Sequence, residues 1–393
     1  MSKLEDLIAE LCPEGVEYKT IESIGNLTRG KRFVRSDVVD NGIPAIHYGD
    51  IYTCYGIWAD TAQINIDERL VDKMRFASKN DVIIVGAGEN DMDIGNAVAW
   101  LGEEKVAIHD ACYILEHNIN SKYISYYMRS SMYHLQIKKY VSTGKICSIS
   151  AKGIGKALIP VPPLPVQAEI VRILDHFTEL TEELIEELTE ELTARKKQYE
   201  YYRDMLFLDA NNIQRVTLDR IAENCDSLRR PVTGANREAG NIPYYGASGI
   251  VDYVKDYIYD GDYLLISEDG ANLRTRTLPI AFSISGKAWV NNHAHVLKFE
   301  EYATRRYVEI YLNSIDLSYY ITGAAQPKLN QKNLNRIPIP LPPLEEQKRI
   351  INILDRFEIL CNNIATGLPA EIEARRKQYE YYRDKLLTFK QLS

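Results

Sequence analysis

Two clusters of basic residues are the first groups in the sequence whose types and spacing could do chemistry. Arg29-Gly-Lys31-Arg32 with Arg35 forms one cluster, and Arg229-Arg230 with Arg237 forms the other. Arginine and lysine hold DNA phosphates and also read base edges in the major groove. Both clusters lie in predicted loops near the start of segments of similar length. We therefore expect these loops to contact DNA, the alternative being solvated loops without a ligand.

Further candidate DNA contacts are polar or basic residues near turns, and tyrosines beside glycines. They are Tyr48, Lys145, Lys152, Tyr245, Asn272, Arg274, Arg276, Gln326, Lys328 and Asn330. Packing is the alternative for the tyrosines. His293 and His295 lie two residues apart on a predicted strand and share one face. Since no other metal-ligand type lies beside them in the sequence, we expect them to pack and not to bind metal.

The sequence contains no recognisable catalytic set. Gly25–Arg32 imitates a phosphate-binding P-loop, but the final Ser or Thr that holds magnesium is missing. Glu103-Glu-Lys105 resembles a nuclease motif only weakly. There is no Asn/Asp-Pro-Pro-aromatic methyltransferase motif and no dinucleotide-binding glycine loop. The six cysteines are scattered, which argues for reduced thiols and against a zinc site. We therefore predict a non-catalytic chain with no cofactor or metal of its own.

The net charge of −8 argues against nucleic-acid binding if it is averaged over the chain. However, seven glutamates fall between Glu179 and Glu191, on what the pattern indicates is one solvated helix. A local basic face matters for DNA, not the total. No apolar run approaches the roughly 18 residues of a membrane helix. Met1–Leu11 lacks the apolar core of a secretory signal, so we expect a cytoplasmic protein.

The sequence contains a long internal repeat. Ile159–Leu164 recurs as Ile339–Leu344, and Arg195–Asp204 recurs as Arg375–Asp384 with nine of ten residues identical. The offset is 180 residues in both places. Gln167, Leu174, Asp175 and Phe177 match Gln347, Leu354, Asp355 and Phe357 at the same offset. A repeated frame that carries two divergent segments predicts two different readers.

The segments between the repeats, roughly 1–158 and 209–336, match weakly but in order. The matched pairs are Ile43-Pro44 with Ile242-Pro243, Tyr48-Gly49 with Tyr245-Gly246, Asp81–Gly86 with Asp262–Ser267, and Lys105–His109 with Lys287–Asn291. Helical patterns follow at 123–140 and 307–320. Apolar runs typical of buried strands followed by helices predict two domains of the α/β (α+β) class.

Each repeat predicts a long helix that begins after its prolines. In the first copy, apolar residues recur at spacings of three and four from Val166: Ile170, Ile173, Phe177, Leu180, Leu184, Leu188, Leu192, Tyr199, Tyr202 and Leu206. The second copy has Ile350, Ile353, Phe357, Leu360, Ile364, Leu368, Ile372, Tyr379, Tyr382 and Leu386. A helix over 166–206 would be about 60 Å long. We expect the two copies to pack antiparallel as a coiled coil, with a kink in the second copy at Gly367-Leu368-Pro369.

The tyrosine block at the end of each helix has two possible roles. Its residues Tyr199, Tyr202, Arg203, Tyr379, Tyr382 and Arg383 either hold the helix pair together or contact a partner subunit. Tyrosine and arginine are enriched where proteins bind one another. The sequence leaves both roles open.

At this point a family resemblance is clear. Ile337–Gln347, an apolar helix and Arg375–Asp384 together resemble the conserved regions of Type I restriction–modification specificity subunits. Thr322–Asn330 is similar to the end of a target-recognition domain, and the duplicated layout covers the whole chain. The loop 142–150 departs from the pattern because it lacks the Gln-x-Lys arrangement of Gln326-Pro-Lys328. A DNA contact by that loop therefore does not carry over.

The resemblance implies two recognition domains, 1–158 and 209–336, separated by two long antiparallel helices in 159–208 and 337–393 that form a coiled-coil spacer with a pseudo-twofold repeat. Each domain would read one half of a bipartite target on double-stranded DNA. Two modification subunits would dock on the chain, bind S-adenosylmethionine and methylate adenine. A restriction (motor and nuclease) subunit remains open as a further partner. The alternatives are a scaffold with protein-binding heads, a specificity subunit of a related restriction system, and an enzyme in its own right.

Overall fold

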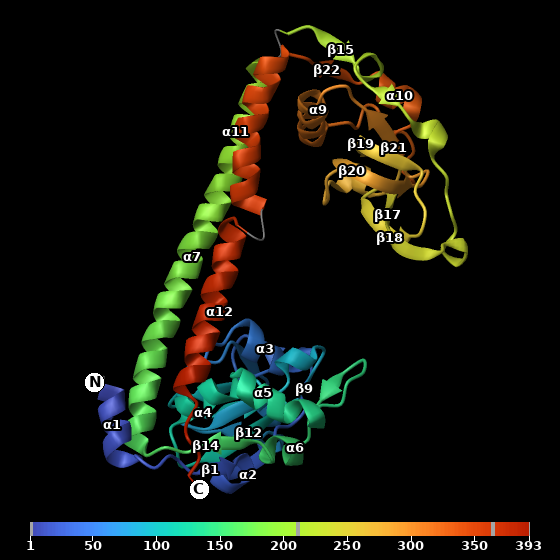
Figure 1. Ribbon diagram of the computed structural model, residues 1–393. Helices are drawn as coiled ribbons and strands as arrows, with labels where there is room; N and C mark the ends of the chain where they lie inside the picture. The colour runs from blue at the N-terminus through green and yellow to red at the C-terminus, as the bar shows by residue number, and fades with distance from the viewer. Residues whose placement is uncertain (1–2, 210–212, 363–365, 393) are drawn as a thin grey trace. The chain divides into compact units, whose positions relative to one another are not determined.

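The computed structural model describes residues 3–209, 213–362 and 366–392. The chain divides into two compact units, one of residues 1–187 with 372–393 and one of residues 188–371. Helix α7 (Leu164–Asp209) contributes to both. Each unit therefore contains one predicted recognition domain together with parts of both predicted helical regions (Figure 1).

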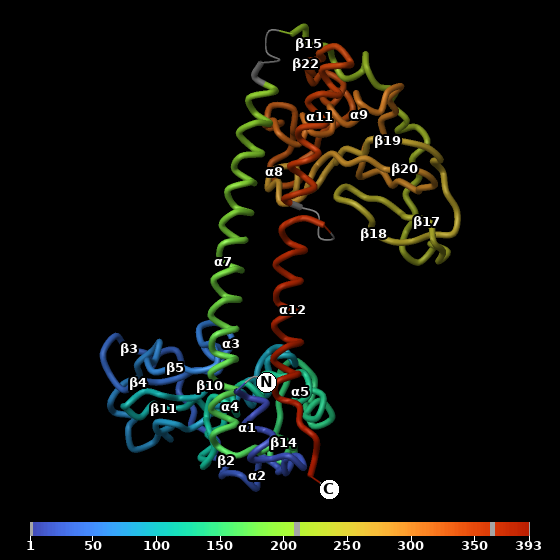
Figure 2. The backbone as a smooth tube through the Cα atoms, turned by 60° about the vertical axis from the view of Figure 1, so that its left-hand side comes forward, coloured from blue at the N-terminus to red at the C-terminus, as the bar shows by residue number. Residues whose placement is uncertain are grey.

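The first unit contains two five-stranded sheets. One has the order β2 (Gly25–Arg29), β12 (Cys112–His117), β8 (Val82–Val85), β10 (Ala97–Trp100) and β5 (Trp58–Ala59). The other has the order β3 (Val38–Val39), β6 (Ile64–Ile66), β4 (Ile43–Ile46), β11 (Val106–Ile108) and β7 (Phe76–Ala77). Strands β8 and β10 are buried throughout, as their continuous apolar sequences predict. Figure 2 shows β3, β4 and β11 of the second sheet together on the left-hand side of this unit.

Short helices complete the first unit. They are α1 (Lys3–Leu11), α2 (Ile21–Ile24), α3 (Tyr48–Thr53), α4 (Ser121–Met128), α5 (Ser131–Ile137) and α6 (Ala151–Gly155). The helix predicted over 123–140 is in fact two helices and a 3-10 turn. The break falls at Arg129-Ser130, where the Ser130 hydroxyl caps α5 by accepting a hydrogen bond from the Tyr133 amide. Strand β9 (Ala87–Gly88) pairs with β13 (Cys147–Ser148), which brings the loop after α5 against the sheet.

The second unit is built on one six-stranded sheet. Its order is β16 (Glu223–Asn224), β21 (Ala294–Lys298), β19 (Tyr259–Ser267), β20 (Ala281–Val290), β17 (Ala239–Gly246) and β18 (Gly249–Val254). Its short helices are α8 (Asn272–Thr275), α9 (Tyr302–Ser314) and α10 (Gln331–Asn335). The predicted helix over 307–320 is α9, which begins earlier and ends at Ser314.

The two units share strand pairings in the same register at equivalent positions, despite their weak sequence match and different sheets. Ala107 and Ile108 pair in parallel with Ala45 and Ile46. In the second unit, Trp289 and Val290 pair in parallel with Tyr244 and Tyr245. The predicted match of Ile43-Pro44 with Ile242-Pro243 is therefore confirmed.

Two of the sequence matches are wrong in register. The backbone bonds from Gly86 to Ala111 and from Glu268 to His293 make Gly86 equivalent to Glu268, one residue beyond the predicted partner Ser267. Tyr245 is equivalent to Ile46, so Tyr48-Gly49, which begins α3, is not the counterpart of Tyr245-Gly246. Apolar runs align equally well one residue apart, and only strand pairing fixes the register.

The proline motifs form the same junction in both units. Strand β14 (Leu158–Pro160) pairs with β1 (Tyr18–Thr20), and β22 (Pro338–Pro340) pairs with β15 (Arg215–Thr217). At the start of each following helix a buried glutamine donates to a proline carbonyl at 2.7 Å, Gln167 to Pro162 and Gln347 to Pro342. Each glutamine also accepts a hydrogen bond from its own domain. These bonds fix the direction in which the helix leaves the domain.

The second helical copy is interrupted, as the glycine and proline predict. Helix α11 (Leu344–Asn362) ends before the break, and α12 (Leu368–Leu386) begins with Pro369 in its first turn. Ile364 of the predicted apolar stripe lies outside the described residues. Ile170, Leu174, Ile350 and Leu354 are buried in the domain cores, so the first part of each stripe packs on a domain.

Further along each stripe, aromatic residues contact the other helical copy in the antiparallel sense. In the first unit Phe177 of α7 meets Tyr382 of α12, with ring centroids 6.5 Å apart. In the second unit Phe357 of α11 meets Tyr202 of α7 at 5.8 Å. These two contacts exchange the same residue types at an offset of 180 residues. The pairing is visible within each unit in Figure 1, and it confirms the predicted antiparallel helices.

We predict that Gln167→Leu destabilises the first unit by about 2 kcal/mol, because it leaves the Asn120 amide and the Pro162 carbonyl buried without partners. Chemical denaturation monitored by circular dichroism measures this change. Gln331→Leu, at an exposed position, is the matched control and should change the stability by less than about 0.5 kcal/mol. Equal effects of the two substitutions would contradict the structural role of Gln167.

Candidate nucleic-acid interface

The basic loop of the first unit follows strand β2 directly. Lys31, Arg32 and Arg35 are exposed. Arg29 is also exposed, but its Nε donates to the Asp110 carbonyl at 2.6 Å, which fixes the direction of the guanidinium. Charged groups that solvent reaches, on a loop anchored to a buried sheet, suit phosphate contacts. The structure leaves their DNA contacts a prediction.

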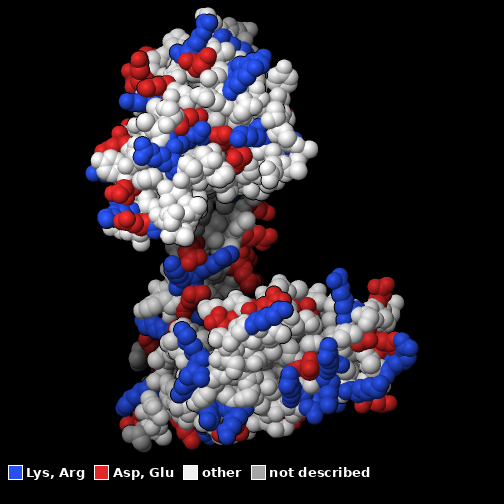
Figure 3. Space-filling view, turned by 90° about the vertical axis from the view of Figure 1, so that its right-hand side faces the viewer, with Lys and Arg blue, Asp and Glu red and all other residues white. Residues whose placement is uncertain are grey.

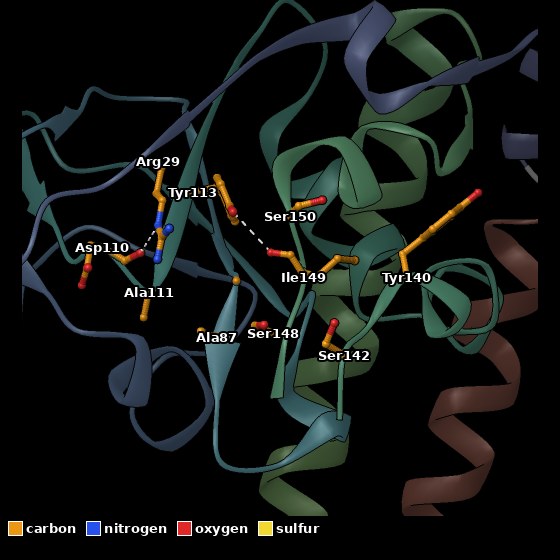
Figure 4. Close-up of a pocket in the computed structure, with 11 residues that line it drawn as sticks. Arg29, Ala87, Asp110, Ala111, Tyr113, Tyr140, Ser142, Ser148, Ile149 and Ser150 are labelled. Atoms are coloured by element: carbon orange, nitrogen blue, oxygen red, sulfur yellow. Dashed lines mark hydrogen bonds between the residues drawn. The ribbon is translucent and has the colours of Figure 1, made fainter. Parts of the chain in front are cut away.

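Arg29 and the loop 142–150 line one cavity of about 310 Å³ in the first unit. Figure 4 shows Arg29 on one side and Ser142, Ser148 and Ser150 on the other. The Tyr113 hydroxyl crosses the space between them and donates to the Ile149 carbonyl at 3.2 Å. Lys145 extends from the same loop and is exposed, as is Lys152 on α6. Two predicted contact regions that lie far apart in the sequence thus meet at this cavity.

Tyr48 belongs to an aromatic cluster in the first unit. Its ring lies 4.2 Å from His47 and 5.9 Å from His109, and Phe33 packs on His109 at 4.9 Å. Burial lowers the pKa of both histidines, and for His109 the neighbouring His47 lowers it further. Phe33 belongs to the basic loop, so the cluster supports that loop. This packing favours a structural role for Tyr48.

The two adjacent arginines of the second unit have opposite environments. Arg230 is exposed. The Arg229 side chain is 14% exposed, with Nη1 at 2.5 Å from the Glu268 carboxylate and Nη2 at 3.3 Å from Asp226. Arg229 also donates to the Ala294 carbonyl at 2.9 Å. These contacts favour a structural role for Arg229, and the basic loop presents Arg230 instead.

Asp226, Glu268 and His295 form a compact group whose ligand atoms lie within 4.8 Å of one another. Such a group could hold a metal ion, but each carboxylate already has a cationic partner. Arg229 contacts both acids, and Lys328 lies 3.1 Å from Glu268. Burial by itself raises the pKa of Asp226, but the hydrogen bond and charge of His295 outweigh it and lower the pKa. Burial also raises the pKa of Glu268, but its ionic contacts, first the hydrogen bond from Arg229, outweigh burial and lower the pKa. We interpret this group as an ion-pair network, here called the second-unit charge network.

Several other predicted contacts are occupied within the second unit. Arg237 packs over the Tyr244 ring at 4.3 Å and pairs with Asp252 at 3.0 Å. Arg276, which adopts a left-handed conformation with φ 52°, donates to the carbonyls of Leu312 and Ile315. Burial lowers the pKa of Arg276. The guanidinium groups of Arg237 and Arg276 therefore stabilise the fold. The sequence could not indicate this role, because their partners are set by the tertiary structure.

The remaining candidates divide in the same way. Asn272 bonds both the amide and the carbonyl of Leu278, and Asn330 caps α10 by accepting from the Asn333 amide. Tyr245 is half-buried beside Phe282. Gln326 is exposed, and Arg274 donates to the Gly323 carbonyl at 2.9 Å, which brings it to the loop of Gln326 and Lys328. The accessible candidates of this unit are therefore Arg230, Arg274, Gln326 and Lys328.

The tyrosine blocks present the same surface twice. Arg203 lies over Tyr199 at 5.7 Å, and Arg383 lies over Tyr379 at 5.9 Å. The most exposed tyrosines of the blocks are Tyr201 and Tyr381, at 61% and 62%, which lie off the apolar stripe and are absent from the predicted contact residues. Their position off the apolar stripe is the feature of the sequence that indicates their exposure. Tyr202 and Tyr382 pack partly on the opposing helix, so this block serves the helix pair and also faces solvent.

Charge on the surface is mixed. On the face shown in Figure 3, basic side chains are interspersed with acidic ones in both units, without one continuous basic patch. DNA contacts would therefore depend on particular loops. Within the described residues, no helix has the length and apolar character needed to cross a membrane.

We predict that Arg229→Ala destabilises the second unit by about 3–5 kcal/mol, because it leaves Glu268 buried without its main cationic partner and removes the contact of Arg229 with the buried Asp226. The adjacent Arg230→Ala should change stability by less than about 0.5 kcal/mol. Denaturant titration of both variants measures the difference. A stability loss of less than about 1 kcal/mol for Arg229→Ala would contradict the network.

Comparison with known proteins identifies the family. The Type I restriction modification DNA specificity domain matches residues 13–194 and again residues 211–374. A putative type I restriction enzyme specificity subunit of Haemophilus influenzae is 38% identical over 191 residues, which are 47% of this chain and 49% of that protein. The match thus spans about half the length of that relative. A putative type I specificity subunit of Mycoplasma pneumoniae is 33% identical over 252 residues, covering 60% of this chain and 98% of the relative.

Solved structures have the same fold at low sequence identity. A structure described for complex assembly and conformational transition of the type I R-M system has a TM-score of 0.68 and 14% identity, covering 96% of this chain and 98% of that chain. The HsdS subunit from Thermoanaerobacter tengcongensis has a TM-score of 0.55 and 15% identity, with coverage of 96% and 97%. The duplicated helices, the two equivalent domains and these matches agree: this chain belongs to the family of the Type I restriction modification DNA specificity domain and carries two copies of it.

Proposed function

We propose that this chain reads a bipartite target on double-stranded DNA for partner subunits that perform the chemistry. The observation that carries the proposal is that two units share one strand register yet present different residues at the same loops. Such a pair suits two unlike half-sites. Exposed Arg29, Lys31, Arg32 and Arg35, with Lys145 of the loop 142–150, would contact the first half-site. Arg230, Arg274, Gln326 and Lys328 would contact the second.

The duplicated tyrosine blocks support two copies of one partner. Tyr201 and Tyr381 are exposed to the same extent, and the arginine–tyrosine contacts beside them have the same geometry. Two equivalent surfaces would accept two equivalent modification subunits. These subunits would bind S-adenosylmethionine and flip the target adenine for methylation. The chain itself would be non-catalytic and would act in the cytoplasm, where cellular DNA is accessible, and a restriction subunit could join the complex.

The α7 helix supports a spacer role. It is one continuous helix of 46 residues that contributes to both compact units. A helix of that length spans about 70 Å at 1.5 Å per residue. We propose that it sets the number of base pairs between the half-sites.

The experiment that tests the function is methylome sequencing of cells with and without this gene, in the presence of the modification subunit. We expect adenine methylation at one motif made of two specified halves and a fixed gap. The triple variant Arg29→Ala, Lys31→Ala, Arg32→Ala in the purified complex should bind a duplex with that motif more weakly. Its dependence on salt should also fall, by about 0.9 in the slope of log K against log salt for each phosphate that the variant no longer neutralises.

The control variant Lys19→Ala, Lys73→Ala, Lys79→Ala makes the same change in net charge outside the candidate loops. It should bind as the unmodified chain does. A motif without two halves would exclude the bipartite reader, and no motif at all would favour a protein-binding scaffold. Unchanged affinity and salt slope in the first triple variant would show that the DNA-binding face lies elsewhere.

A further inference from the structure

One strand position lies beneath the same loop in both units. This loop, residues 142–150 in the first unit and 322–330 in the second, is here called the reading loop. Tyr113 of β12 pairs with Ile84, and His295 of β21 pairs with Ile266. The loop that follows is tied to the sheet by the same backbone bond in each unit, Ile149 to Gly86 at 2.8 Å and Leu329 to Glu268 at 2.7 Å. Tyr113 and His295 are therefore structurally equivalent, although their side chains differ in chemistry.

Each side chain forms a hydrogen bond with the backbone carbonyl of the loop residue at the equivalent position, Ile149 or Leu329. The Tyr113 hydroxyl donates to Ile149 at 3.2 Å, as the dashed line in Figure 4 shows, and His295 Nε2 lies 2.7 Å from the Leu329 carbonyl. Both side chains are buried, His295 with 1% of its surface exposed. A buried hydrogen bond from a core strand to a loop carbonyl restricts where that loop can lie.

The neighbours of these residues differ in a matched way. A Cβ atom on Gly86 would lie 2.4 Å from the Tyr113 ring, so the large ring requires glycine there. In the second unit the equivalent residue is Glu268, and the smaller imidazole leaves room for it. The glutamate in turn binds Arg229 and Lys328. Each unit thus has its own compatible set of residues around one anchoring bond.

The imidazole of His295 has an acceptor on both sides. Nδ1 lies 2.6 Å from the Asp226 carboxylate, and Nε2 faces the Leu329 carbonyl. A carbonyl and a carboxylate only accept hydrogen bonds, so each contact is a hydrogen bond where the facing ring nitrogen carries a proton. The charged groups around the ring are Asp226, Glu268 and, through them, Arg229 and Lys328. His295 accordingly bridges η7 (Asp226–Leu228) and the loop.

We propose that His295 and Tyr113 are positioning residues that hold the reading loop of their own unit, 322–330 and 142–150, in the conformation that reads DNA. This rests on the proposed function and adds the residues that determine how specifically each half-site is read. Neither side chain touches DNA in this account. A loop held in its bound conformation loses less entropy on binding and discriminates better between bases.

Two substitutions of His295 by uncharged amide residues distinguish the hydrogen bond to the loop from the contacts of His295 with the second-unit charge network. His295→Gln places an amide donor near the position of Nε2 and can retain the bond to Leu329. His295→Asn places its donor near Nδ1, so it can retain Asp226 but loses the loop. Both replace the imidazole with a neutral amide, and a purely structural role would affect them alike.

The experiment selects bound duplexes from a random-sequence library, using the full chain in complex with its co-expressed modification subunit, and sequences them. The unmodified complex should specify two blocks of bases. His295→Asn should reduce the preference in one block by about tenfold, near the upper end of the effect expected for one buried hydrogen bond. His295→Gln should keep most of that preference. Tyr113→Phe should weaken the other block and leave the first intact.

The outcomes separate the two proposals. If the unmodified complex selects no sequence, the proposed function fails. If it selects two blocks but His295→Gln and His295→Asn lose the same preference, or if His295→Asn and Tyr113→Phe weaken the same block, the positioning role is wrong. Nitrogen-15 spectra of histidine-labelled chain at neutral pH provide a second measurement. The signal that both His295 variants lose should show a protonated Nε2, and an unprotonated Nε2 there would overturn the bond to the Leu329 carbonyl.

Discussion

The pairing of the two helical copies is the constraint on which the remaining structure depends. An amphipathic helix as long as α7 cannot bury its apolar stripe alone. Its first turns pack on a domain core, and beyond them the other copy supplies the partner, α12 in one unit and α11 in the other. The exchange of Phe177–Tyr382 for Tyr202–Phe357 shows that one interface is used twice. The near identity of the repeats follows, because each residue must fit the same counterpart in two places.

The domains are under a weaker constraint. Their sheets keep strand pairing and register, since backbone hydrogen bonds set these without regard to most side chains. Beneath the loops, however, Gly86, Tyr113 and Arg29 in one unit stand where the other has Glu268, His295 and Asp226. One unit therefore has a cavity at this point and the other a charge network. A fixed frame with exchangeable residues at the loops explains how two different readers arise from one duplicated fold.

Sequence reasoning predicted the features that depend on local pattern. The repeat, the proline junctions, the antiparallel helices and the break at Gly367-Leu368-Pro369 all follow from periodicity and from the geometry of proline. It failed where tertiary contacts decide. In the sequence, Arg229 and Arg276 look the same as Arg230 and Arg274, because all four are arginines in predicted loops. The burial of Arg229 and Arg276 depends on acids and carbonyls that are distant in the sequence. The apolar periodicity predicts the residues that pack, and Tyr201 and Tyr381 lie off this periodic stripe, so it does not identify them.

We propose that the paired helices hold two readers at a set separation on DNA. The most direct measurement is the methylated motif of a chain with four residues inserted after Leu188 in α7 and four after Gly367 in the second copy. Four residues lengthen a helix by about 6 Å, close to two base pairs of DNA at about 3.4 Å each. The account predicts the same two half-sites with a longer gap between them. Efficient methylation at the original gap alone would show that the helices do not set the spacing.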